Sequence, residues 1–175
     1  MKTLPDYLSR GSRLVIVGCN PSVTAARTGL YYSGRGNQFW SLLYDSGLVP
    51  ERLRPLDTVR VTEFGIGLTD LVKRPTKSSG DVLTREFGEG RDLLHRKLKR
   101  ISCPRVIVFN GKIVYERFIR KKCNYGLQDH LLYGAKVYVM PSTSRRCARA
   151  SYSQKLRHFR NVFQLIEAKE GKQLE

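Results

Sequence analysis

Short apolar runs, each ended by a glycine, a proline or a polar residue, divide the chain into segments that we expect to form buried strands. Four such runs predict strands at about 13–18, 64–72, 105–109 and 136–140. Their nearly continuous apolar character is typical of parallel strands that helices cover on both faces.

Between these runs, apolar residues recur at helical spacing. The clearest stripe predicts the last helix and consists of Tyr152, Leu156, Phe159, Phe163 and Ile166. Shorter stripes predict helices after Asn37, from Thr84 to about residue 100, and after Lys112. The segments 21–36 and 121–134 are expected to be irregular. Segment 48–62 is expected to be a polar surface connection with at most a short helix.

The alternation of strands and helices predicts a single-domain α/β protein over residues 1–175, with its core at about 13–168. We expect a three-layer α/β/α sandwich around a mostly parallel, four-stranded sheet. Right-handed crossovers would bring the loops that follow the strands to one edge of that sheet. This edge would collect polar residues that each follow a predicted strand: Asn20, Asp70, Asn110 and the loop 142–146.

The first predicted strand ends abruptly at Gly18 and is followed by Cys19-Asn20-Pro21-Ser22. Proline has no N–H to donate to a ladder, so the strand cannot continue through Pro21. Asn20 therefore lies in a loop at the carboxyl end of a core strand, where open α/β sheets bind their ligands. A plain Asn-Pro turn is the alternative interpretation of the same residues.

Charge is the strongest feature of the composition. The chain has 32 Lys and Arg against 15 Asp and Glu, a formal net charge of +17. A folded domain this basic is expected to bind a polyanion, most often nucleic acid. No acidic residue lies between Asp129 and Glu167, an interval that includes Arg145 and Arg146. A solvated helix face is the alternative, although such faces normally mix both signs of charge.

Other classes of protein find little support in the sequence. No apolar run has the length of a membrane span, and the first residues lack the apolar core of a signal peptide. We therefore expect an intracellular monomer, nuclear in a eukaryote or located in the cytoplasm and nucleoid of a prokaryote. The four cysteines, Cys19, Cys103, Cys123 and Cys147, form no Cys-x-x-Cys pair. They predict free thiols, with no metal and no organic cofactor.

Two polar loops flank the predicted edge, and the aromatic pair Tyr31-Tyr32 lies between them in a glycine-rich segment. An amide, a flat aromatic ring and a cationic loop are the groups needed to hold a nucleobase that has left the DNA helix.

These polar and aromatic residues, together with the segments around them, make the sequence resemble the mismatch-specific uracil and thymine DNA glycosylases of the uracil-DNA glycosylase superfamily. The resemblance spans about residues 13–165 and rests on five blocks in the family's order: Gly18-Cys19-Asn20-Pro21-Ser22, residues 34–40 (GRGNQFW), residues 65–76 (GIGLTDLVKRPT), residues 109–112 (FNGK) and residues 140–148 (MPSTSRRCA).

The resemblance implies a monofunctional glycosylase that needs no cofactor. Asn20 matches the catalytic asparagine that positions the attacking water, and Tyr32 matches the aromatic residue that stacks on the flipped base. Asn37 matches an amide near that pocket, although a helix cap explains Asn37 equally well. Backbone N–H groups near Cys19 and Tyr32 would stabilise the departing base. The wedge and DNA-contacting residues implied in the last loop are Ser142, Ser144, Arg145 and Arg146.

Four residues depart from the family pattern. Ser22 stands where the family usually has glycine, and Leu30-Tyr31 replaces a His-His pair of the thymine enzymes. Asp70 stands in place of an asparagine that faces the base. An ionised Asp70 could not donate to uracil O4, so its pKa is raised, or it meets a donor such as N3–H, or it helps to activate water. A cap for the following turn is the structural alternative.

These features predict a DNA glycosylase that flips uracil out of double-stranded DNA and hydrolyses its N-glycosidic bond, with preference for G·U mispairs and with G·T as a further candidate. Action on another deaminated base, or a non-enzymatic basic DNA-binding domain, are the alternatives. A Schiff-base lyase with Lys112 as its nucleophile is a third option, without further support in the sequence.

Overall fold

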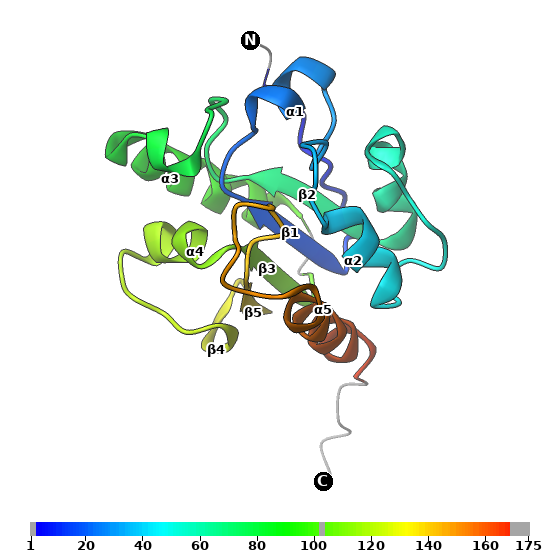
Figure 1. Cartoon of the computed structure of the whole chain (residues 1–175). Coiled ribbons are helices and arrows are strands. Elements are labelled where there is room, and N and C mark those ends of the chain that lie inside the picture. Colours follow the sequence, from blue (N-terminus) through cyan, green and yellow to red (C-terminus); the bar gives the residue numbers. More distant parts are fainter. Residues whose placement is uncertain (1–2, 102–103, 169–175) are drawn as a thin grey trace, which may run out of the picture.

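The computed structural model describes residues 3–101 and 104–168. A five-stranded sheet with the order β2-β1-β3-β5-β4 forms its centre (Figure 1). The strands are β1 (Leu14–Gly18), β2 (Ile66–Asp70), β3 (Val106–Asn110), β4 (Gly126–Leu132) and β5 (Ala135–Met140). All neighbouring strands are parallel except β4, which pairs antiparallel with β5.

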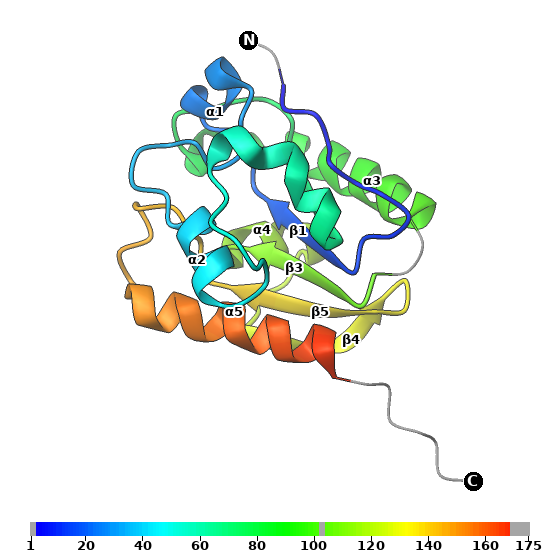
Figure 2. The ribbon, with the colours of Figure 1, turned by 90° about the vertical axis from the view of Figure 1, so that its right-hand side faces the viewer.

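Helices cover both faces of the sheet, which confirms the predicted three-layer α/β/α sandwich (Figure 1). The helices are α1 (Val23–Thr28), α2 (Phe39–Asp45), α3 (Thr84–Arg100), α4 (Lys112–Ile119) and α5 (Tyr152–Glu167), with 3-10 helices η1 (Pro55–Phe64) and η2 (Ser79–Asp81). Figure 2 looks onto the layer that contains α2 and α5. Across the described ranges, no helix combines the length and the apolar character that a membrane crossing requires.

The strands alternate their side chains between two separate cores. In β1, Leu14 and Ile16 join the cluster formed with α2, α5 and η1, whereas Val15 and Val17 join the cluster formed with α3 and α4. All five residues of β1 are buried. Burial of both faces explains why this strand appears in the sequence as an unbroken apolar run.

Two segments differ from their prediction as irregular chain. Residues 126–132 form β4, so the sheet has five strands and not four. Residues 23–28 form the short helix α1, where Ser22 Oγ accepts a hydrogen bond from Ala25 N at 3.1 Å. Gly29 ends this helix with a φ of 75°, a left-handed conformation that glycine adopts without a steric penalty.

The N-terminal segment crosses the outer edge of β2. Tyr7 N donates to Leu68 O at 2.9 Å, and Leu68 N donates to Tyr7 O at 2.8 Å. This antiparallel bridge satisfies backbone groups that an edge strand would otherwise expose. The preceding residue, Asp6, is thereby held next to Thr69, whose hydroxyl donates to Asp6 Oδ1 at 2.6 Å.

Candidate active site

The loops that follow β1, β2, β3 and β5 meet at the carboxyl edge of the sheet and line a cleft of about 910 Å³. Parallel strands bring their following loops to the same edge, so residues distant in sequence become neighbours there. The nine site residues predicted from the sequence all line this cleft: Cys19, Asn20, Tyr32, Asn37, Asp70, Ser142, Ser144, Arg145 and Arg146.

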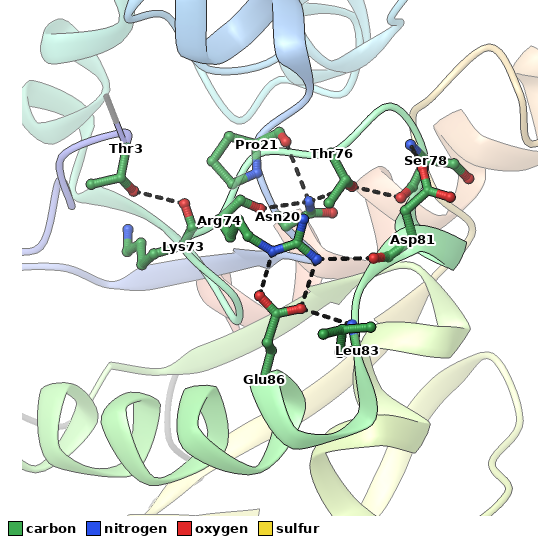
Figure 3. A network of polar contacts seen from close by, with 10 residues as sticks. All are labelled: Thr3, Asn20, Pro21, Lys73, Arg74, Thr76, Ser78, Asp81, Leu83 and Glu86. Atoms are coloured by element: carbon green, nitrogen blue, oxygen red, sulfur yellow. Dashed lines mark hydrogen bonds and ion pairs between the residues drawn. The ribbon is translucent and has the colours of Figure 1, made fainter. Parts of the chain in front are cut away.

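Asn20 is held by its amide nitrogen. The Nδ2 atom donates to Arg74 O at 2.9 Å, to Thr76 Oγ1 at 2.7 Å and, less closely, to Pro21 O at 3.3 Å (Figure 3). The Thr76 hydroxyl gives its own proton to Ser78 O at 2.5 Å, so it can only accept from Asn20. These contacts fix the orientation of the amide and leave its oxygen as the atom available to a water molecule.

Thr76 is a site residue that the sequence interpretation did not single out. It also lines the cleft, and its backbone N–H donates to Pro21 O at 3.1 Å. The segment around Thr76 therefore runs beside the Asn20 loop and holds both the backbone and the side-chain amide. The available signal was a polar residue, directly after Pro75, in the loop that follows a strand ending in Asp70.

An aromatic wall closes one side of the cleft. The ring of Tyr32 stacks on Phe39, with centroids 3.9 Å apart and an interplanar angle of 22°. Because Phe39 occupies one face of this ring and the Tyr32 hydroxyl is buried, a base has access only to the other face. Tyr32 has a φ of 53°, a conformation uncommon outside glycine, which directs its side chain into this wall.

Asp70 ends β2 at the buried side of the cleft. Its side chain is 4% exposed, and its Oδ2 atom has no hydrogen-bond partner within the described chain. Burial raises the pKa of Asp70 to about 7; Lys73 opposes this shift, Asp6 adds to it, and Lys97 opposes it more weakly. This state matches the raised pKa that was one of the sequence interpretations.

The alternative in which Asp70 caps the following turn is wrong. The turn's first two N–H groups belong to Leu71 and Val72, and they donate to Gly18 O at 2.9 Å and Cys19 O at 2.8 Å. Cys19 lies next to Asp70, and burial raises the pKa of its thiol to about 12, with a further contribution from Asp70. The neutral thiol of Cys19 is therefore a poor nucleophile.

Asn37 lies one residue before Gln38, the N-cap of α2, and binds the first backbone N–H of that helix. Its Oδ1 atom accepts a hydrogen bond from Phe39 N at 3.0 Å at the start of α2. The next residue, Gln38, connects this segment to the last loop, because Gln38 N donates to Thr143 O at 3.0 Å. Asn37 thus lies at the cleft while its oxygen is used within the protein.

The last loop is held from three directions. Asn110 clamps Thr143 through two hydrogen bonds of 3.1 Å, from Asn110 Nδ2 to Thr143 Oγ1 and from Thr143 N to Asn110 Oδ1. The buried Lys155 donates to Gln38 Oε1 at 2.9 Å and lies 3.5 Å from Ser144 O. Arg145 packs against Gly36, where a Cβ atom would lie only 2.8 Å from its Cδ.

The hydroxyl groups of the last loop order its backbone. Ser142 Oγ accepts from Ser144 N at 3.3 Å, and Ser144 Oγ accepts from Arg146 N at 3.3 Å. The exposed Arg146 reaches across the cleft, where its Nη1 donates to Lys77 O at 2.6 Å. The loop thus presents a cation at the mouth of the cleft, joined to the opposite loop.

The rim of the cleft is basic. Four cations line it, Arg35, Lys77, Arg145 and Arg146, and Asp70 is the acidic residue of the lining. This distribution suits a polyanion that lies across the mouth while a neutral group enters the interior. Within the described ranges, no three His, Cys, Asp or Glu side chains are arranged to hold a metal ion.

Lys112 and Cys123 lie outside the cleft lining, whereas Cys147 is part of it. The Lys112 ammonium lies 4.8 Å from the centre of the Tyr125 ring, and Lys112 is not among the residues that line the cleft. This position gives the lyase alternative no support. Cys123 and Cys147 are free thiols like Cys19, whereas Cys103 lies outside the described residues.

Comparisons with known proteins agree with this fold. A family model described as "Uracil DNA glycosylase superfamily" matches residues 5–167. The fold is similar to the solution NMR structure of "a putative Uracil DNA glycosylase from Methanosarcina acetivorans", with a TM-score of 0.67 and 23% sequence identity. The match covers 95% of this chain and 98% of that chain.

Proposed function

The chain belongs to the uracil DNA glycosylase superfamily, and from this premise we propose that it removes uracil from double-stranded DNA by hydrolysing the N-glycosidic bond. The observation that carries the proposal is the fixed amide of Asn20. Its nitrogen is committed to Arg74 O and Thr76 Oγ1, so its oxygen can orient a water molecule in the cleft.

In this reaction the water oxygen forms a bond to C1′ of the sugar, and the bond from C1′ to N1 of uracil breaks. The bonding electrons leave with uracil, and the proton of the water passes to solvent or to the departing base. An amide oxygen orients water but is a poor base. The site therefore depends on stabilising the uracil anion, for which we propose the backbone N–H groups near Cys19 and Tyr32.

The basic rim supplies affinity for the DNA backbone. Arg35, Lys77 and Arg145 lie where phosphates on either side of a flipped nucleotide would pass. Arg146 is the proposed wedge, because it is exposed at the mouth and its guanidinium can leave Lys77 O for the gap in the base stack. The hydroxyls of Ser142 and Ser144 are further candidates for phosphate contacts.

We further propose a preference for uracil opposite guanine, with thymine opposite guanine as a second candidate. Flipping costs a few kcal/mol and costs least at a mispair, so weakly paired sites are favoured even without contacts to the opposite base. The replacement of asparagine by Asp70 bears more on thymine than on uracil, and it extends the range of candidates to other deaminated bases.

Base release from four labelled duplexes tests the proposal, with G·U, A·U, G·T and G·hypoxanthine pairs. We expect alkali-labile sites from G·U with the wild type and a loss of at least about 100-fold in Asn20→Ala. The matched control is Asn124→Ala, an exposed asparagine outside the cleft, which should retain full activity.

Two results would contradict the proposal. Tight, salt-dependent binding without release from any duplex would identify a DNA-binding domain without glycosylase chemistry. A covalent adduct after borohydride treatment on uracil-containing DNA would identify a Schiff-base lyase, which the proposal excludes.

A further inference from the structure

Asp70 places a buried carboxyl group at the inner wall of the cleft. Its side chain is 4% exposed, its Oδ2 atom is unpaired within residues 3–101 and 104–168, and the residue lines the cleft. Gly18 makes room for it, because a Cβ at residue 18 would collide with Asp70 Oδ1. A buried polar group left unpaired costs free energy until a ligand satisfies it.

Two lysines lie near Asp70, and both form ion pairs with the same other acid, Asp6. Lys73, from the loop after β2, forms an ion pair with Asp6 Oδ1, and Lys97, from α3, pairs with Asp6 Oδ2 at 2.7 Å. Lys73 also donates to Leu4 O at 3.2 Å. Asp6, supplied by the N-terminal segment, thus competes with Asp70 for both lysines, and their remaining stabilisation of an ionised Asp70 is smaller than the opposing effect of burial.

The remaining groups around Asp70 do not compensate its charge either. Cys19 follows β1, and Tyr31 and Tyr32 come from the loop before α2; each has its pKa raised by burial and by Asp70 itself. Among the described residues, the Tyr31 hydroxyl has no hydrogen-bond partner, and the Tyr32 hydroxyl lies near Asn110 without completing a hydrogen bond to it. With both lysines paired to Asp6 and Oδ2 without a partner in the described part of the chain, burial makes the neutral acid the favoured form of Asp70.

We propose that Asp70 is a specificity-determining residue, which as a neutral acid donates its O–H to the exocyclic carbonyl oxygen of a lactam base in the cleft. The acid's own carbonyl oxygen then accepts from the adjacent ring N–H. Uracil and hypoxanthine both present this pair of groups. An ionised Asp70 offers two acceptors and repels the carbonyl oxygen, so loss of the proton removes recognition. This inference rests on the proposed glycosylase function.

The position of the pH transition follows from the surroundings of Asp70. Burial raises its pKa to about 7, with Lys73 and Lys97 opposing and Asp6 adding to the shift. Above that pH, the neutral fraction falls tenfold for each pH unit. We therefore expect excision of lactam bases to decline along the same slope.

The test is the single-turnover rate of base release from G·U and G·hypoxanthine duplexes between pH 5.5 and 9 at constant ionic strength. The comparison is with Asp70→Asn, whose amide N–H donates at every pH. We expect the wild-type rate to fall about tenfold per pH unit above pH 7. The rate of Asp70→Asn should change by less than about threefold over the same range.

The possible outcomes separate the inference from the proposed function. Diverging pH profiles support both. Parallel profiles with base release intact overturn the role of Asp70 and leave the glycosylase activity standing. No release from either duplex at any pH overturns the proposed function, and the role of Asp70 falls with it.

A second measurement tests the protonation state of Asp70 in the wild-type protein, so that a folding defect in the variant does not affect the conclusion. The carboxyl carbon of Asp70, labelled with carbon-13 and identified by its loss in Asp70→Asn, should titrate near pH 7 in the free protein. Titration below pH 5 overturns the inference whatever the variant's activity.

Discussion

Arg74 and Glu86 form a two-point ion pair, with 2.5 Å between Arg74 Nε and Glu86 Oε1 and 2.8 Å between Arg74 Nη2 and Glu86 Oε2 (Figure 3). Glu86 Oε2 also accepts from Leu83 N at 2.7 Å, at the start of α3. The carbonyl oxygen of the same Arg74 accepts from Asn20. The pair therefore anchors the loop that orients the proposed catalytic amide to a long helix.

This anchor predicts that Glu86→Gln lowers kcat for uracil release by about three- to tenfold, with little change in KM. A neutral side chain holds the Arg74 loop less firmly, and small displacements of a positioning group reduce the rate. Arg74 lowers the pKa of Glu86 to about 2, so the pair is charged throughout an assay range of pH 5–9. Single-turnover and steady-state rates on a G·U duplex measure the effect.

Glu51→Gln is the control for this experiment. Glu51 pairs with Arg60 near η1, outside the cleft, through Oε1 and Arg60 Nη2 at 2.7 Å. Equal losses in the two variants would show that ion pairs act only through general stability, contrary to the positioning role of Arg74 and Glu86.

The Thr76 hydroxyl accepts a hydrogen bond from the Asn20 amide at 2.7 Å. We expect Thr76→Val to lower kcat by about 10- to 100-fold, because the amide loses this acceptor and can rotate. Thr76→Ser keeps the hydroxyl and should stay within a few-fold of the wild type. Rates on a G·U duplex provide the measurement. A Val variant as active as the Ser variant would show that the other acceptors suffice to orient Asn20.

Because the pKa of Asp70 is raised in the folded protein, we expect the difference in stability between Asp70→Asn and the wild type to depend on pH. The unfolded chain releases this proton near pH 3.8 and the folded chain near pH 7, so its stabilising contribution is complete below pH 3.8 and is lost as the pH rises to 7. Relative to the wild type, Asp70→Asn should gain roughly 3–4 kcal/mol between pH 4 and pH 8.

Urea unfolding at several pH values measures this difference. Asp129→Asn is the control, since Asp129 is exposed on β4 and should produce no such trend. A constant offset between Asp70→Asn and the wild type across the range would mean that the carboxyl is ionised in the folded protein.

We expect removal of the Arg146 side chain to lower the rate of uracil release by an amount that depends on the base pair. Arg146→Ala removes the proposed wedge, so the rate should fall by more for uracil in an A·U pair, where flipping is costlier, than in a G·U pair. We expect about tenfold and threefold losses, respectively. Arg96→Ala, an exposed change on α3 outside the cleft, serves as the control. Equal losses on both duplexes would assign Arg146 to phosphate contacts alone.

The parts of the fold that the sequence predicts are those with a strong apolar pattern. The sequence alone is enough to recognise β1 and β3 from their unbroken apolar runs and α5 from its apolar stripe. Burial requires apolar residues at fixed spacing in these elements. In contrast, β4 lies at the edge with most of its side chains exposed or half-buried, and α1 buries only Ala25 and Ala26. Their positions depend on pairing with β5 and on the Ser22 and Gly29 caps.

The site likewise has features that the sequence predicts and features that only the structure reveals. Topology alone brings the strand-end residues Asn20, Asp70 and Asn110 to one edge, which is why the sequence could group them. The contacts that set their chemical state join residues far apart in the chain. Thr76 lies 56 residues from Asn20, and Asp6 lies 67 residues from Lys73. Contacts between loops leave no periodic trace in a sequence, so only the structure reveals them.

The bridge between Tyr7 and Leu68 gives the first residues a protective role. Without them, β2 would offer a bare row of backbone donors and acceptors to any other extended chain, including a second molecule of the same protein. Deletion of the segment should therefore promote self-association through sheet edges. It would also remove Asp6 and return two lysine charges to the neighbourhood of Asp70. The N-terminal segment thus links the tendency of the protein to self-associate with the protonation state of Asp70 in the cleft.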